Sequence, residues 1–134
     1  MEKNNMTSYI FDTSFLISLV DINDINHAQS VEIMKDLTVD ESRFFINDLI
    51  YSETITVLTY KKGTDSLDVL ESFLNKIRIN FVNSNMSDYV NLFKSLRKKV
   101  SIADISVVYD SIKYNTVPLC FDKEIMKIIK QVRG

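Results

Sequence analysis

Apolar residues recur along this chain with two spacings that alternate from one end to the other. Short apolar or alternating runs predict β-strands, and returns every three or four residues predict α-helices. The predicted strands lie near residues 8–11, 44–46, 77–82 and 117–121. The predicted helices lie near residues 15–19, 24–37, 48–61, 67–77, 89–96, 103–114 and 123–132. Strands separated by helices indicate βα units and a mostly parallel sheet covered on both faces, which is a three-layer α/β/α fold.

The length and composition indicate one globular domain over residues 1–134, in which residues 1–6 form a flexible polar tail. With two glycines and one proline, the chain has no evident linker. No apolar run approaches the roughly 18 residues of a membrane span, and the N-terminus lacks the apolar stretch of a signal peptide. A single cysteine, Cys120, rules out an internal disulfide. We therefore expect a cytoplasmic protein without a membrane partner.

Four acidic residues occupy positions that an ordinary fold would not give to a bare carboxylate. Asp12 and Asp122 end apolar runs, and Glu53 and Asp104 fall on the apolar rows of two predicted helices. Asp12 and Asp122 could instead be helix N-caps, and Asp104 could belong to a capping box with Ser101. Because unpaired buried carboxylates are costly, we expect the four to converge on a divalent cation.

All-oxygen ligands suit Mg²⁺ or Mn²⁺, and such sites accept phosphate substrates. The net charge of −2 lacks the basic excess of a simple nucleic-acid binder, but two bound divalent cations would change it to +2. The lone His27 and lone Cys120 cannot form a typical zinc site. His27 is predicted to be structural or on the surface, Asp21 and Asp24 to be solvated, and Asp110 to be a surface charge.

Four segments in this order resemble the four motifs of the PIN domain family over nearly the whole chain: 11–16, 51–53, 103–108 and 118–123. The resemblance implies that Asp12, Glu53, Asp104 and Asp122 form the acidic metal site, with Ser14 as a hydrogen-bonding helper. Two positions depart from the usual family pattern. Cys120 stands where many members have threonine, which weakens the expected support for Asp122, and Ile105 replaces a commonly small residue.

The chain is similar in length and build to the VapC-type toxins of toxin–antitoxin pairs, which cut RNA. That similarity implies a metal-dependent endoribonuclease, a homodimer and a cognate antitoxin. Lys61, Lys62 and Lys123 are the expected contacts to the RNA backbone, although such lysines can equally be solvated helix ends. The alternatives are a PIN nuclease that processes RNA or acts on DNA, and a silent PIN fold that binds RNA or a protein.

Overall fold

The structure is a computed structural model that describes residues 6–134, so most of the predicted tail lies outside the described residues. Its strands are β1 (Ser8–Phe11), β2 (Arg43–Asn47), β3 (Asn80–Val82) and β4 (Val117–Leu119). Its helices are α1 (Thr13–Val20), α2 (His27–Val39), α3 (Asp48–Lys62), α4 (Asp65–Lys76), α5 (Met86–Leu96), α6 (Ile102–Lys113) and α7 (Lys123–Arg133). Of the helices described, none has both the length and the apolar content that crossing a membrane requires.

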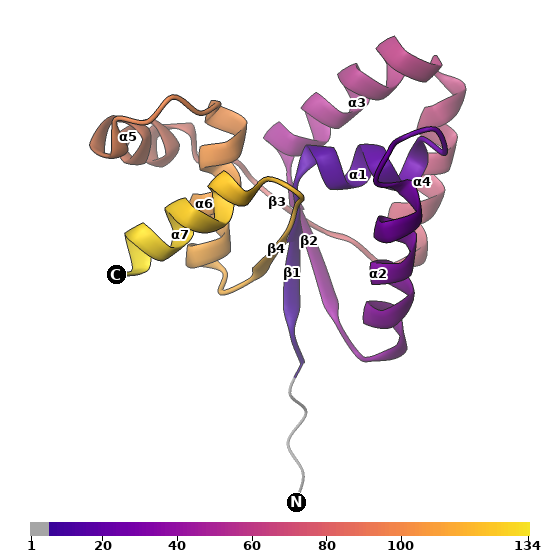
Figure 1. Cartoon of the computed structure of the whole chain (residues 1–134), viewed down its shortest axis with the longest axis horizontal. Helices are drawn as coiled ribbons and strands as arrows, with labels where there is room; N and C mark the ends of the chain where they lie inside the picture. Colours follow the sequence, from indigo (N-terminus) through magenta and orange to yellow (C-terminus); the bar gives the residue numbers. More distant parts are fainter. Residues whose placement is uncertain (1–5) are drawn as a thin grey trace, which may run out of the picture.

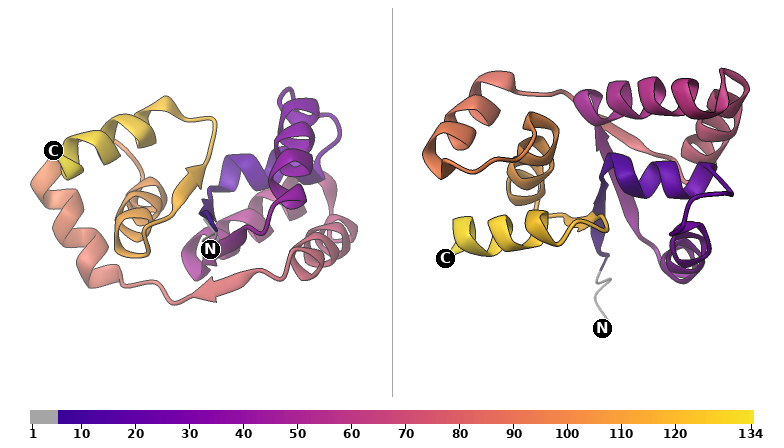
Figure 2. Two further views of the ribbon diagram at one scale, coloured as in Figure 1. Left: turned by 90° about the horizontal axis from the view of Figure 1, so that it is seen from below. Right: turned by 45° about the horizontal axis from the view of Figure 1, so that its top comes forward.

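The strands form one sheet in the order β3-β2-β1-β4, and every neighbouring pair is parallel. Tyr9 of β1 pairs with Phe44 on one side and Val117 on the other. Helices α1, α2 and α4 lie to one side of the sheet, and α5, α6 and α7 lie to the other (Figures 1 and 2). The predicted α/β fold with a parallel central sheet and helices on both faces is confirmed.

Aromatic side chains fill much of the core on the α1 side of the sheet. The Phe11 ring stacks on Phe44 with centroids 5.8 Å apart and meets Phe73 edge-on at 6.0 Å. Phe15 stacks on Phe121 at 5.4 Å, which joins the start of α1 to the segment after β4. Such pairs contribute about 0.5–1.5 kcal/mol beyond their buried area. The Phe15–Phe121 pair adds to the direct pairing of β1 and β4 at their carboxyl ends.

Some predicted boundaries differ from those observed. The strand expected over 77–82 begins only at residue 80, because α4 continues to Lys76 and Arg78 then takes a left-handed φ of 56°. Helix α2 begins at His27 rather than near residue 24, because the carboxylates of Asp21 and Asp24 accept bonds from backbone N–H groups two residues on and stabilise turns. Ile25 therefore lies on the turn before α2 and is 96% exposed.

The predictions for two aspartates were wrong. Asp110 is 1% exposed instead of lying on the surface, and it accepts hydrogen bonds from Tyr89 Oη at 2.6 Å and Asn47 Nδ2 at 2.9 Å. Asp21 is 7% exposed instead of solvated, and it pairs with Lys62. Each carboxylate can be buried because residues distant in the sequence supply its partners.

Candidate functional site

The four predicted acidic residues come together at one end of the sheet. Asp12 follows β1 and Asp122 follows β4, and these two strands are parallel neighbours, so their carboxyl ends share one edge. Glu53 lies in the first half of α3, and Asp104 lies in the first turn of α6. One pocket of about 400 Å³ is lined by all four, together with Thr13, Ser14, Ile17, Asp24, Ile25, Asn26, Val57, Lys61 and Ser101.

Asp12 is the most buried of these carboxylates, with 6% exposure. Asp12 occupies the N-cap position of α1, but within residues 6–134 its side chain makes no hydrogen bond to the first turn of that helix. Helix capping therefore does not explain why a carboxylate stands there. Its Oδ2 instead accepts a hydrogen bond from Ser14 Oγ at 2.8 Å. Burial, assisted by the charges of Asp104 and Glu53, raises the pKa of Asp12 to about 6 against the Ser14 hydrogen bond.

Asp104 and Asp122 both line the pocket and cap their own helices. Ser101 Oγ accepts from Asp104 N at 3.0 Å, and Ser101 N donates to Asp104 Oδ2 at 3.4 Å, which completes a capping box. Asp122 Oδ1 accepts from Glu124 N at 2.8 Å. The capping alternatives are therefore confirmed for these two residues without removing either from the pocket. Burial, with the charges of Asp122 and Glu53, raises the pKa of Asp104.

Glu53 lies at the rim of the pocket rather than on the buried face of α3. Its side chain is exposed, whereas Ile50 and Thr54 beside it are buried. Glu53 Oε1 accepts a hydrogen bond from Thr13 Oγ1 at 2.5 Å, which ties α3 to the start of α1. The apolar pattern around residue 53 did not identify Thr13, because the contact spans 40 positions of the chain.

The donor atoms of the pocket fit a hard divalent cation in their chemistry. They are carboxylate and hydroxyl oxygens, and like charges within one pocket repel one another unless protons or cations neutralise them. Residues 6–134 contain no group of three or more Asp, Glu, His or Cys side chains that are already placed to hold a metal ion. Two of the carboxylates accept bonds from backbone N–H groups, and a third accepts from Thr13. The structure thus presents suitable donors without a closed set of ligands.

Comparison with known proteins agrees with this geometry. The model of the PIN domain family matches residues 9–130. The chain belongs to the PIN domain family.

Three solved structures share the PIN fold at low sequence identity. VapC20 of Mycobacterium tuberculosis, a toxin that cleaves the sarcin–ricin loop, has a TM-score of 0.75 and 14% identity over 90% of this chain and 94% of its own. VapBC2 of Rickettsia felis, bound to a promoter DNA fragment, has a TM-score of 0.66 and 12% identity over 91% of this chain and 93% of its own. VapBC-1 of nontypeable Haemophilus influenzae has a TM-score of 0.66 and 15% identity over 93% of this chain and 94% of its own. No curated protein matches the chain.

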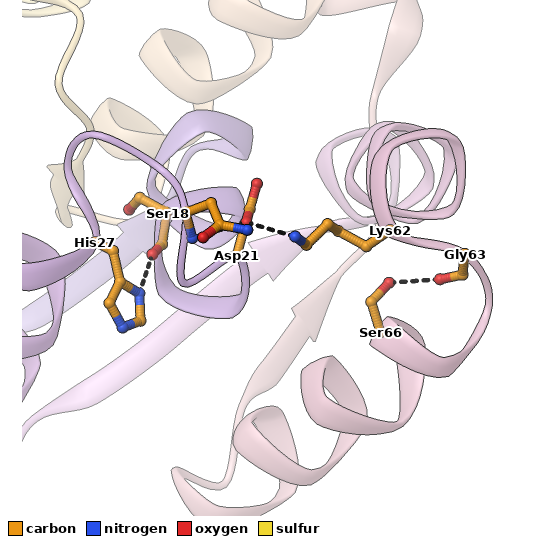
Figure 3. Close-up of polar contacts among 7 residues, drawn as sticks. Ser18, Asp21, His27, Lys62, Gly63 and Ser66 are labelled. Carbon is orange, nitrogen blue, oxygen red and sulfur yellow. Dashed lines mark hydrogen bonds and ion pairs between the residues drawn. The ribbon is translucent and has the colours of Figure 1, made fainter.

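The three lysines predicted to contact RNA have different surroundings in this PIN domain. Lys61 lines the acidic pocket. Lys62 Nζ lies 3.2 Å from Asp21 Oδ1, and Figure 3 shows the two side chains pointing toward each other. Lys123 is exposed at the start of α7 and is not among the pocket residues. Lys61 is therefore the lysine best placed to meet a substrate in the pocket.

Cys120, at the position where many PIN domains have threonine, gives Asp122 little support. Its Sγ lies 3.7 Å from the backbone oxygen of Asp122, and thiols are weak donors. Burial raises the pKa of the Cys120 thiol to about 12, with the charge of Asp12 acting in the same direction. The Asp122 carboxylate is oriented by the Glu124 N–H instead.

A larger cavity of about 700 Å³ lies away from the four carboxylates, between α1, α2, β2 and α4. Apolar side chains such as Val20, Met34 and Phe73 line its interior, and Lys35 and Arg78 are among its polar residues. Among the residues described, its lining has no carboxylate cluster comparable with that of the smaller pocket.

Proposed function

We propose that this PIN domain is a divalent-metal-dependent endoribonuclease that hydrolyses RNA phosphodiester bonds. The observation that supports the proposal is the convergence of Asp12, Glu53, Asp104 and Asp122 on one pocket. These residues come from four separate segments, so their meeting is a property of the tertiary structure. Such a set of oxygen donors, within a PIN domain, is suited to Mg²⁺ or Mn²⁺.

In this proposal the four carboxylates would hold the ion, and the neighbouring hydroxyls would orient them. A bound divalent ion lowers the pKa of water and neutralises charge that develops on phosphate oxygens. Ser14 fixes Asp12, and Thr13 fixes Glu53, so both carboxylates are held by residues at the start of α1. The burial that raises the pKa of Asp12 also strengthens its attraction to a cation, because less water competes for its charge. The chain needs no nucleophile of its own.

We further propose that the protein is the toxin of a toxin–antitoxin pair. Its similarity in fold and length to VapC20, which cleaves the sarcin–ricin loop, and to the VapBC structures supports this assignment. The antitoxin would place a basic side chain against the acidic pocket, and the apolar cavity beside α1, α2 and α4 would offer it additional surface. If a small gene lies adjacent to its own, co-expression of the two followed by purification would test for that partner.

The activity itself is tested by incubating the purified protein with mixed RNA, with and without Mn²⁺. We expect cleavage that requires the metal and falls about 100-fold or more in Asp12→Asn, since residues that merely support metal ligands already contribute 10–100-fold. Asp36→Asn is the matched control, because Asp36 is an exposed carboxylate on α2 that does not line the pocket.

Three other outcomes would change the assignment. Cleavage without dependence on metal or Asp12 would contradict the proposal. RNA binding without cleavage would favour a silent PIN fold, and cleavage of DNA in preference to RNA would favour a different nuclease.

A further inference from the structure

The acidic pocket is also lined by side chains other than the four carboxylates. They include a fifth carboxylate, Asp24, the hydroxyls of Thr13, Ser14 and Ser101, and Ile17. The remaining four are Ile25, Asn26, Val57 and Lys61. Two of these side chains are apolar, one is an amide and one is a cation. Residues 25 and 26 come from the segment between α1 and α2, and residues 57 and 61 lie one turn apart on α3.

Ile25 is unusual because it is 96% exposed at the mouth of a polar pocket. A single exposed isoleucine needs no explanation by itself. Ile22, in the same segment, is 73% exposed and does not line the pocket. What distinguishes Ile25 is that it lines the same pocket as the four carboxylates, together with Val57 and Asn26.

The segment that carries Ile25 is held to its surroundings by several polar contacts. The buried Asp21 carboxylate pairs with Lys62 at the end of α3 and accepts from Asn23 N at 3.0 Å. Asp24 Oδ1 accepts from Asn26 N at 2.8 Å. His27 Nδ1 lies 2.8 Å from the Ser18 backbone oxygen, and Figure 3 shows this contact beside the Asp21–Lys62 pair. A segment fixed in this way loses less conformational entropy when a ligand binds.

Asn26 adds a group that can recognise the edge of a base. It begins α2, yet its side chain makes no cap bond to that helix within residues 6–134. Its amide therefore keeps both donor and acceptor atoms for a ligand. Proteins read unpaired RNA bases with such amides on the base edge and with apolar or aromatic side chains against the base face.

We propose that Ile25, Asn26 and Val57 form a subsite for one unpaired nucleobase next to the phosphate at the carboxylates. This inference rests on the proposed ribonuclease function and names the part of the pocket that selects its substrate. The base lies against Ile25 and Val57, Asn26 bonds to its edge, and Lys61 faces the backbone phosphate. The pocket volume of about 400 Å³ lies within the roughly 300–1,000 Å³ typical of small-ligand sites.

The first test compares Ile25→Ala with Ile22→Ala, two identical substitutions in one exposed segment. We expect Ile25→Ala to raise KM for RNA roughly tenfold, the scale of a small apolar contact, while kcat changes by less than about twofold. Ile22→Ala should leave both constants unchanged. Asn26→Ala should change which nucleotide flanks the cut, as read by sequencing the RNA ends. Equal KM values for the two isoleucine variants, with cleavage intact, would overturn the subsite and leave the nuclease assignment standing.

Binding provides a readout that does not need catalysis. In the Asp12→Asn protein, fluorescence anisotropy with short labelled homopolymers of A, C, G and U should show the same tenfold loss with Ile25→Ala. If the wild-type protein failed to cleave RNA but this loss appeared, the proposed function would be wrong and the subsite would stand. If the loss was absent, the subsite would be wrong whatever the activity.

The Asp21–Lys62 pair tests whether the fixed segment matters. Lys62→Ala should raise KM in the same direction as Ile25→Ala, and Lys62→Arg should restore it because the arginine can still pair with Asp21. A direct contact between Lys62 and RNA predicts a different result. In that case Asp21→Ala alone would have a normal KM. The double variant Asp21→Ala, Lys62→Ala would then have a KM no lower than that of Lys62→Ala in low salt. That result would contradict the role assigned to the segment.

Discussion

Asp12 differs from the other three carboxylates of the pocket because its side chain is almost fully withdrawn from water. Burial disfavours its charged form, and the negative charges of Asp104 and Glu53 add to the effect. Ser14 offsets only part of it, so the pKa of Asp12 is about 6. Near neutral pH, the protein therefore maintains a buried charge that favours binding of a cation.

This residue predicts how stability depends on pH in metal-free protein. The pKa of Asp12 is higher in the folded state, about 6, than its ordinary value of 3.8, so the folded state holds more protons between these values. Its contribution to stability is fully present below pH 3.8 and is lost as pH rises through about 6. A pKa difference of about two corresponds to about 3 kcal/mol. Urea unfolding in EDTA at several pH values should show the free energy of unfolding falling across this window.

Asp12→Asn should remove most of that fall, because the amide does not titrate. Asp104→Asn should remove a smaller part, since the pKa of Asp104 is also raised. Asp36→Asn serves as the control and should keep the wild-type slope. A wild-type slope in Asp12→Asn would contradict the burial of this carboxylate as the cause of the pH dependence.

At the scale of elements, a buried network joins the helices that carry Glu53 and Asp104. Asn47, at the end of β2, accepts from Ile50 N at 2.7 Å and so caps α3. Its amide donates to Asp110 at 2.9 Å and to Ser106 at 3.1 Å, both on α6. Tyr89 of α5 donates to the same carboxylate at 2.6 Å. The network therefore connects the start of α3 to α5 and α6.

Asn47→Ala should be costly because it removes three hydrogen bonds and leaves Asp110 with one fewer partner in a buried place. Loss of the helix cap and of one of the two hydrogen bonds to the buried Asp110 carboxylate together predict about 2–4 kcal/mol of destabilisation. Asn80→Ala is the matched control, since the Asn80 side chain makes one bond, to the Phe44 oxygen at 3.0 Å. It should cost less than about 1.5 kcal/mol. Urea unfolding of both variants measures the difference, and equal values would show that the network adds nothing.

For the whole molecule, the acidic pocket concentrates negative charge that a cation would neutralise. A divalent ion that binds only the folded state should stabilise it by about 2.7 kcal/mol at a hundredfold excess over the dissociation constant. The melting temperature should therefore rise with millimolar Mg²⁺ or Mn²⁺ in the wild-type protein and much less in Asp12→Asn. An unchanged melting temperature across that range would contradict the proposed metal site.

The exposed apolar side chains of the molecule bear on its assembly. Tyr60, Phe81, Met86 and Val90 are between 42% and 94% exposed. We predict a symmetric homodimer, the commonest soluble assembly, with both acidic pockets opening onto one groove. Light scattering should give twice the chain mass of 15.5 kDa at micromolar concentration. A monomer mass under those conditions would rule the dimer out.

Much of the fold could be predicted because its signals are local. The spacing of apolar residues indicated strands and helices, and their alternation indicated a parallel sheet. Asp12 and Asp122 could be placed at one edge because each directly follows a strand, and the carboxyl ends of parallel strands meet there. The strand expected at 77–82 was too long because Ile77 also continues the apolar row of the preceding helix. Its position fits both the spacing of a helix and the alternation of a strand.

The tertiary structure alone decided the partners and the exposure of individual side chains. Asp110 is buried because Asn47 and Tyr89 reach it from other elements, and Asp21 is buried because Lys62 does. Ile25 has the apolar side chain of a core residue but lies on a turn that carries it to the mouth of the pocket. A periodic pattern reports which face of an element is apolar. The contacts that satisfy a carboxylate or leave an isoleucine in water depend on groups far away in the chain, and folding is what brings those groups together.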